Sequence, residues 1–211
     1  VIDGKGKFLM PGLTDAHVHF FQSGGLYTRP DAIDLRKYTP YKNEIEWAHS
    51  NFEDLLRRYT KAGITTVIDP GSTLNFLEQR KSFADKAYSP TIYMTGPLLT
   101  TYEPEPYKNL DHDEPFTLIR SAENARAAVQ KQLPYHPDFI KIWYITSRNE
   151  KTVEDSARKF LPYVKAAIDE AHKNNLRVAV HATQKITAEL AAESGCDYLV
   201  HSVDDKIISD E

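Results

Sequence analysis

The chain has 211 residues, with 26 Lys and Arg against 30 Asp and Glu, so its net charge is −4 at neutral pH. This weakly acidic balance gives no electrostatic reason to expect binding to nucleic acid or to an anionic membrane. Hydrophobic residues make up 41% of the chain, which is too many for a disordered protein, and no run approaches the roughly 18 apolar residues of a membrane span. The single cysteine, Cys196, excludes a disulfide within the chain.

The two ends of the sequence lead us to expect a piece of a longer protein. The chain opens at Val1 rather than at a methionine, and it closes with KIISDE, which resembles the start of a helix. A missing signal peptide therefore does not identify the compartment, although we favour the cytoplasm.

Six short apolar runs, often β-branched and bounded by turn residues, have the pattern of buried parallel strands. They cover Leu13–His19, Ile64–Asp69, Thr91–Thr95, Phe139–Tyr144, Arg177–Ala182 and Tyr198–Ser202. Helical periodicity lies between them, over residues 52–62, 164–171 and 186–191, the last closed by Gly195. Ser50 and Glu53 are expected to form a capping box, and Gly63 to end the first helix. Pro162 is expected to start or kink the second.

Alternating strands and helices predict an α/β chain with a parallel sheet and helices outside it. An open doubly wound sheet and a (β/α)8 TIM-type barrel both satisfy this pattern. No glycine-rich phosphate loop follows any strand, and polar residues at the strand ends favour the barrel, present here only in part, with about six strands. Two long connections, residues 20–45 and 96–121, are rich in tyrosine and are expected to be either a substrate lid or surface excursions.

His17 and His19 stand two residues apart in the first predicted strand. Side chains at i and i+2 of a strand point to the same face, so both imidazoles are expected to lie at its carboxyl end. Two neutral imidazoles in this arrangement are a natural start to a site for a divalent metal ion.

Three later strands carry comparable residues near their carboxyl ends. Lys141 lies within the apolar run FIKIWY, where a full positive charge is costly, so either its amine reaches the rim or it is deprotonated and used. His181 ends VAVHA and His201 ends YLVHS. Because the carboxyl ends of barrel strands converge on one opening, we expect these side chains to meet there.

The stretch FLMPGLTDAHVHF resembles the signature of the amidohydrolase superfamily, and Lys141, His181 and His201 match its later metal positions in order. The sequence is most similar to the branch that contains imidazolonepropionase-like enzymes and metal-dependent Xaa-Pro and Xaa-Arg dipeptidases. The resemblance implies two divalent ions, usually zinc. His17 and His19 would bind the first ion and His181 and His201 the second. Lys141, carboxylated by carbon dioxide, would bridge them.

The same resemblance implies a hydrolase that cleaves an amide or cyclic-amide C–N bond of a small-molecule substrate with a metal-bound hydroxide, with Lys141 and His201 in catalytic roles. It implies that residues 1–12 are the tail of a flanking β-sandwich segment. Residues 13–211 would form barrel strands one to six, with strands seven and eight, and the catalytic Asp of the eighth, outside this chain. We therefore expect the chain alone to be inactive. For Asp15 we expect a supporting or strand-pairing role, and a homo-oligomer is one open possibility.

Two departures from the family pattern keep alternatives open. Thr183 stands where many dipeptidase relatives have a second histidine, and Gln184 where deaminases of the superfamily have a glutamate. The alternatives are an aminohydrolase with one metal ion acting on a heterocycle, and a non-catalytic fragment.

Several other residues are candidates for substrate contact. Tyr102 and Tyr144 could offer a hydroxyl to a substrate, although the sequence favours aromatic packing for both. Arg148 could bind a carboxylate or be simply solvated. Cys196 is expected to be a small buried residue. Four histidines that match no motif are expected at the surface: His49, His112, His136 and His172.

Overall fold

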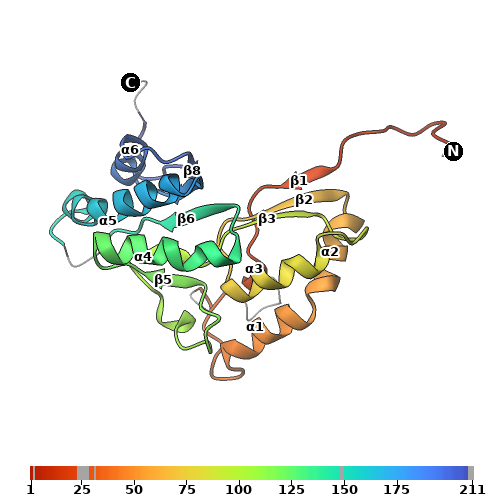
Figure 1. The fold of residues 1–211 in the computed structure, drawn as a ribbon, viewed down its shortest axis with the longest axis horizontal. Coiled ribbons are helices and arrows are strands. Elements are labelled where there is room, and N and C mark those ends of the chain that lie inside the picture. The colour runs from red at the N-terminus through yellow and green to blue at the C-terminus, as the bar shows by residue number, and fades with distance from the viewer. Residues whose placement is uncertain (2, 23–28, 31, 148–149, 209–211) are drawn as a thin grey trace.

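A computed structural model describes residues 1, 3–22, 29–30, 32–147 and 150–208. Within them, short parallel strands form two sheets (Figure 1). The strands are β1 (Leu13–Asp15), β2 (Ile64–Asp69), β3 (Thr91–Met94), β4 (Leu98–Thr100), β5 (Phe116–Leu118), β6 (Phe139–Trp143), β7 (Arg177–His181) and β8 (Tyr198–Val200). The smaller sheet has the order β1-β2-β3 and the larger the order β5-β4-β6-β7-β8. All described strand pairs are parallel, as predicted.

Helices cover one face of each sheet (Figure 1). They are α1 (Tyr41–Ser50), α2 (Phe52–Lys61), α3 (Leu74–Arg80), α4 (Ala122–Gln132), α5 (Val153–Lys173) and α6 (Lys185–Glu193). Short 3-10 turns are η1 (Phe20–Gln22), η2 (Lys81–Phe83), η3 (Glu105–Tyr107) and η4 (Leu133–Tyr135). The first three helices share a buried apolar cluster with the smaller sheet, and the last three share another with the larger sheet.

The chain passes from the smaller sheet to the larger one between Met94 and Leu98. The backbone N–H of Thr95 donates to the carbonyl of Asp69 at 3.0 Å, and that of Asp138, just before β6, donates to the carbonyl of Met94 at 3.0 Å. These bonds place the sheets side by side, with the carboxyl ends of the strands toward one rim. The α/β fold with a partial set of barrel strands is confirmed.

The described residues do not close this partial barrel, because β1 and β8 are the outer strands of their sheets. Apolar side chains on the open side are correspondingly exposed: Leu13, Tyr93, Tyr198 and Leu199 retain between 44% and 50% of their accessible surface. Residues 3–12 contain no strand and extend away from the sheets, with Phe8 and Leu9 fully exposed (Figure 1). None of the described helices combines the length and apolar character needed to cross a bilayer.

Two strand predictions were wrong. β1 ends at Asp15 rather than at His19, because the side chain of Asp15 accepts the backbone N–H of His17 and interrupts the ladder. The connection 96–121 contains β4 and β5, two strands of only three residues each that leave little periodic signal. In the other long connection, residues 23–28, including Tyr27, lie outside the described residues.

The three predicted helices are confirmed, but two of them begin at other residues than expected. Helix α2 begins after Asn51, and no side chain caps it, so the expected capping box of Ser50 and Glu53 was wrong; α1 occupies Ser50 instead. Gly63 has φ of 80°, the left-handed conformation that ends helices and that glycine adopts without strain. Pro162 lies inside α5, which starts nine residues earlier behind Thr152, whose hydroxyl accepts the N–H of Asp155 at 3.0 Å.

Candidate metal centre

His17 and His19 come together just beyond β1. Although the strand ends at Asp15, the backbone continues in an extended path, because the N–H of Val18 donates to the carbonyl of Ile68 in β2 at 2.9 Å. The two imidazoles therefore point to the same side, and their Nε2 atoms lie 3.2 Å apart. Asp15 pairs with Val67 in the sheet and accepts the backbone N–H of His17 at 3.3 Å, a strand-pairing role as expected.

Lys141 and His181 share a face of the larger sheet. Lys141 stands opposite Ala179 in the parallel register, and Trp143, two residues on, stands opposite His181. The Lys141 side chain is only 1% exposed, so the interpretation that it reaches solvent was wrong. Burial lowers the pKa of its amine to about 8, although the carboxylate of Asp69 acts in the opposite direction.

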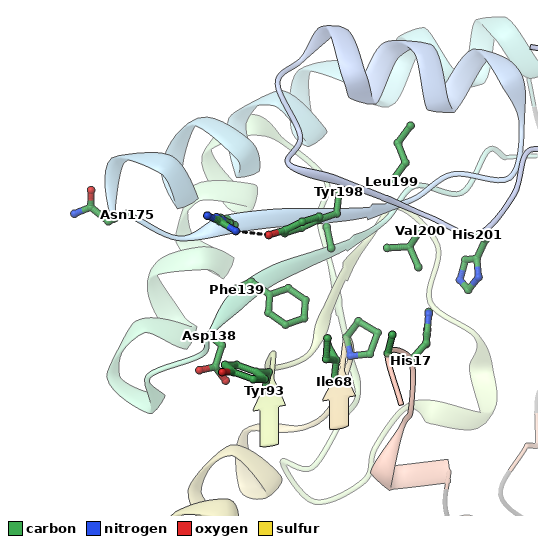
Figure 2. A pocket seen from close by; sticks show the side chains of 14 residues that line it. His17, Ile68, Tyr93, Asp138, Phe139, Asn175, Tyr198, Leu199, Val200 and His201 are labelled. Atoms are coloured by element: carbon green, nitrogen blue, oxygen red, sulfur yellow. Dashed lines mark hydrogen bonds between the residues drawn. The ribbon is translucent and has the colours of Figure 1, made fainter. Parts of the chain in front are cut away.

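His201 completes the arrangement from the end of β8. Its backbone has φ of 74°, a conformation that non-glycine residues seldom adopt, and this turn directs the ring back toward the rim. The His201 ring lies 4.8 Å from that of His17 and 4.6 Å from that of His181, measured between centroids. In Figure 2 the rings of His17 and His201 face each other across the gap between the two sheets.

Three imidazoles of this rim, those of His17, His181 and His201, have a lowered pKa, which favours their neutral form. Burial, followed by the neighbouring His19, Lys141 and His201, lowers the pKa of His17 to about 3. Burial and the same neighbourhood lower the pKa of His181 to about 3, and burial and Lys141 also lower that of His201. A neutral imidazole keeps a lone pair available, which is the form that binds metal ions.

The donor types and one distance fit a divalent ion. Two nitrogens bound at about 2.0–2.1 Å to one tetrahedral ion lie about 3.3 Å apart, close to the 3.2 Å between the Nε2 atoms of His17 and His19. As the side chains stand, no three His, Cys, Asp or Glu residues in the described part of the chain form a group that could hold an ion. The imidazoles are nevertheless gathered at one rim, with the rings of the second pair, His181 and His201, 4.6 Å apart between centroids.

Asp69, at the end of β2, is a residue of this region that the sequence analysis missed. It is completely buried, and its carboxylate accepts the backbone N–H groups of Phe20 and Gly71, each at 3.1 Å. Its Oδ1 also lies 3.4 Å from Nδ1 of His19. Burial raises the pKa of Asp69, against the hydrogen bonds from His19 and the two backbone groups. The available signal was a carboxylate directly at the end of the apolar run ITTVID.

A cavity of about 820 Å³ opens below the imidazoles, between the two sheets (Figure 2). His17 and His201 lie at one end of it, and its walls are largely apolar side chains, including Ile68, Phe139 and Leu199. Asp138, Asn175 and Arg177 also line it, and Tyr93, Tyr198 and Leu199 place it on the open side of the partial barrel.

The tyrosines considered for substrate contact behave differently from each other. Tyr144 is 2% exposed, and its hydroxyl donates to the carbonyl of Ala157 in α5, so it packs in the core, the interpretation that the sequence favoured over substrate contact. Tyr102 is exposed at the rim, with its ring 6.3 Å from that of Trp143. Arg148 lies outside the described residues.

His49 was wrongly expected at the surface. Its ring is half-buried and stacks on Phe76 at 3.8 Å between centroids. Nε2 lies 2.6 Å from Oδ2 of Asp113, and Nδ1 lies 2.6 Å from Oε1 of Gln79. The other three histidines expected at the surface, His112, His136 and His172, are exposed. Cys196 is half-buried against the larger apolar cluster.

The fold and the rim define a class of protein: an α/β chain of parallel strands with histidine and lysine side chains at the carboxyl ends of the first, fourth and later barrel strands. The chain belongs to the amidohydrolase family, whose sequence model matches residues 8–206. The family suggested by the sequence is therefore confirmed. No protein of curated function matches the chain.

Solved structures show the same fold. One amidohydrolase is 22% identical, with a TM-score of 0.67, and the match covers 97% of this chain and 51% of that one. A prolidase complexed with N-methylphosphonate-L-proline is 21% identical, with a TM-score of 0.69 and coverage of 96% and 51%. A Xaa-Pro dipeptidase with bound methionine is 23% identical, with a TM-score of 0.57 and coverage of 90% and 47%. The chain thus spans about half the length of these structures.

Proposed function

We propose that this chain provides most of the binuclear metal site of a hydrolase that cleaves amide or cyclic-amide C–N bonds. His17 and His19 would bind one divalent ion, and His181 and His201 the other. Zinc is the ion we expect. Lys141, as a carbamate, would bridge the pair. The observation that carries the proposal is the meeting of four imidazoles from three separate strand ends within ring contact of one another.

The environment of Lys141 supports its part in the proposal. A carbamate forms when the neutral amine attacks the carbon of carbon dioxide: an N–C bond forms, one C=O bond opens to an oxyanion, and the amine releases a proton. Burial favours the neutral amine that this step requires, because a charged amine is poorly solvated in the core. The product is an anionic oxygen ligand suited to divalent cations.

The imidazoles and the neighbouring cavity would have separate roles in the proposed reaction. When bound, the ions would lower the pKa of a coordinated water and polarise the scissile carbonyl. His17 and His181 stay neutral across the physiological range because burial lowers their pKa to about 3, so protons do not compete with the ions for these nitrogens. The cavity beside His17 and His201 has largely apolar walls and would receive the apolar part of a small substrate.

The contacts of Gln184 argue against the deaminase alternative. Its side-chain oxygen accepts the hydroxyl of Thr146 at 2.9 Å, and it precedes α6 as the N-cap residue. An amide in this position has no proton to transfer between water and a heterocycle. Gln184 therefore ties the loop after β6 to the start of α6.

The test is metal content and activity in the product of the complete reading frame that encodes these residues. We expect two zinc ions per chain, hydrolysis within a panel of dipeptides, cyclic amides and lactones, and a carbamate signal in 13C NMR after labelling with carbon dioxide. Lys141→Ala should abolish the carbamate signal, the two-ion content and most activity, while His172→Ala, a change at an exposed histidine, should leave all three unchanged.

Each part of this result can contradict the proposal. A single ion with deamination of a heterocycle would favour the aminohydrolase, and two-ion binding that survives Lys141→Ala would remove the carbamate. Absence of any metal binding and turnover would leave a non-catalytic chain.

A further inference from the structure

We propose that Asp69 is a positioning residue that acts through His19. It holds the His19 ring in the orientation and tautomer that present Nε2 to a metal ion. The inference deepens the proposed function and rests on it for the identity of the ligand, but its structural content can be tested without metal.

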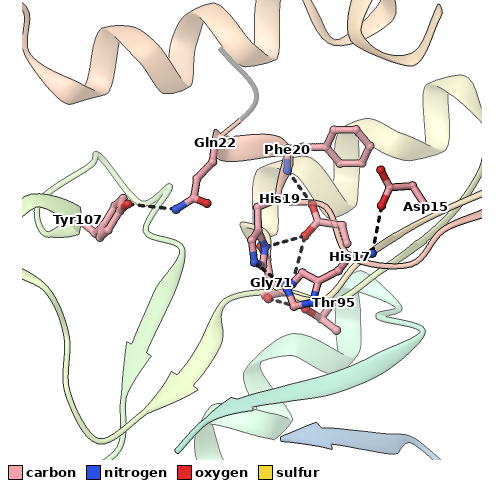
Figure 3. A network of polar contacts seen from close by, with 10 residues as sticks. Asp15, His17, His19, Phe20, Gln22, Gly71, Thr95 and Tyr107 are labelled. Atoms are coloured by element: carbon pink, nitrogen blue, oxygen red, sulfur yellow. Dashed lines mark hydrogen bonds and ion pairs between the residues drawn. The ribbon is translucent and has the colours of Figure 1, made fainter. Parts of the chain in front are cut away.

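The carboxylate of Asp69 joins the segment that carries His19 to the turn after β2. Oδ2 accepts the N–H of Phe20, the residue following His19, at 3.1 Å. Oδ1 accepts the N–H of Gly71 at 3.1 Å and lies 3.4 Å from Nδ1 of His19. Figure 3 shows His19, Phe20 and Gly71 close together, with dashed lines for the polar contacts between them and their neighbours. Asp69 therefore fixes the backbone at Phe20 and at Gly71, the two segments that flank the His19 ring.

The neighbouring carbonyl determines where the His19 proton lies. Nδ1 of His19 is 2.8 Å from the carbonyl oxygen of Gly71, which can only accept a hydrogen bond. Nδ1 must therefore carry the proton, and the negative charge of Asp69 beside it favours the same tautomer. Nε2 is left with its lone pair, 3.2 Å from Nε2 of His17. Without an ion, His17 is then the donor in this pair.

The backbone at Gly71 is fitted closely to the same ring. A Cβ at this position would lie 3.1 Å from Cε1 of His19 and 2.5 Å from Cδ1 of Leu98. A side chain here would displace the ring or the leucine, so the turn leaves His19 little freedom to rotate. Asp69 holds this turn through the N–H of Gly71 and holds the segment that carries His19 through the N–H of Phe20.

The competing explanation is that Asp69 only stabilises the turn. Metal-binding imidazoles that lose a supporting acceptor bind their ion about 10–100-fold more weakly. If Asp69 were purely structural, its removal would lower the stability of the fold but would not change which nitrogen of His19 carries the proton. The state of the His19 nitrogens therefore separates the two explanations.

The experiment uses the 211-residue chain, with 15N NMR of the histidine rings and zinc titration. In the wild type, His19 should show a single Nδ1–H tautomer. The side chain of Asp69→Asn has one acceptor oxygen and cannot accept from both Gly71 and Phe20, so the Gly71 carbonyl should lose its fixed place against Nδ1. The variant should therefore mix the two tautomers of His19 and weaken zinc binding about 10–100-fold. Asp15→Asn is the matched control: it makes the same chemical change in an acid that accepts the backbone N–H of His17 and should leave the His19 signals in place.

A double-mutant cycle tests whether Asp69 acts through His19. In a His19→Ala background, Asp69→Asn should have no further effect on zinc affinity. In a His17→Ala background, the effect should persist. An equal loss in both backgrounds, or unchanged His19 signals in Asp69→Asn, would overturn the proposal.

Two further results test the proposal if Asp69→Asn does not fold or if the wild type does not bind zinc. If Asp69→Asn does not fold, Asp69→Ala removes the acceptor without adding a donor, and a wild-type His19 protonated on Nε2 would by itself refute the proposal. If the wild type binds no zinc, the proposed function fails, while the tautomer of His19 still decides the role of Asp69.

Discussion

The rings of His17 and His201 lie 4.8 Å apart, although one follows the first strand of the chain and the other follows the last. His17 reaches this position from the smaller sheet and His201 from the larger one. Their contact forms only when both sheets are folded and correctly placed. Ligand binding at this rim is therefore coupled to the complete tertiary structure of the chain.

Zinc is expected to stabilise the folded chain for this reason. A ligand that binds only the folded state adds about 2.7 kcal/mol to the free energy of unfolding at 100 times its dissociation constant. His201→Ala should remove most of this gain, because it deletes a ligand contributed by the far end of the chain. Chemical denaturation with and without zinc measures the effect. Zinc stabilisation of His201→Ala equal to that of the wild type would contradict the prediction.

Lys141→Met is expected to raise stability in the absence of metal. The substitution replaces a buried amine with an apolar side chain of similar length, and the lowered pKa of the amine corresponds to a cost of about 3 kcal/mol for burying its charge at neutral pH. The pKa of Lys141 is lowered to about 8 from 10.5, so the unfolded chain binds more protons between these values. The stability of the wild type should therefore rise with pH across that range, relative to the variant.

Denaturation curves of both proteins measured between pH 8 and 10.5 check this prediction, and the difference between them isolates Lys141 from other titrating groups. A variant that is less stable than the wild type at neutral pH would show that the amine makes favourable contacts that outweigh its burial.

Tyr144→Phe is expected to lower stability by about 0.5–1.5 kcal/mol, because it deletes the hydroxyl that donates to the buried carbonyl of Ala157. Zinc affinity should not change, because the ring lies in the core and not at the rim. Tyr102→Phe is the matched control at an exposed tyrosine and should leave stability within error. Thermal unfolding and zinc titration of the two variants give the comparison, and a loss of zinc affinity in Tyr144→Phe would return this residue to the site.

The pair formed by His49 and Asp113 is expected to make stability depend on pH. Burial lowers the pKa of His49, but hydrogen bonds to Asp113 and Gln79 outweigh it, and the net pKa is raised above 6.5. The folded chain therefore binds this proton more tightly than the unfolded chain. The stabilisation is complete below pH 6.5 and is lost as the pH rises through the folded pKa.

Asp113→Asn should lower the free energy of unfolding by about 1–3 kcal/mol below pH 6.5 and flatten this dependence. His172→Ala provides the control, because His172 is an exposed histidine whose Nε2 lies 2.9 Å from Asp197. Urea denaturation across the range checks both variants. A pH profile of Asp113→Asn parallel to that of the wild type would show that His49 is not the titrating group.

The sequence by itself determined the parallel α/β class and four of the side chains now found together at the rim, with Lys141 as the fifth candidate. Short apolar runs and the i, i+2 spacing of His17 and His19 are local signals, and the carboxyl ends of parallel strands share one edge whatever the details of packing. The position of His17 and His19 was therefore predicted correctly even though β1 ends at Asp15 and not at His19.

Only the tertiary structure decided what lies around those side chains. Asp69 and Gly71, at the end of β2, contact His19, which follows the neighbouring strand β1. His49 in α1 contacts Asp113, which lies in a loop far along the chain. Tyr144 turns into the core because its hydroxyl finds the carbonyl of Ala157 in α5. Contacts of this kind depend on the three-dimensional path of segments far apart in the chain, and no periodicity in the sequence encodes which polar groups will meet.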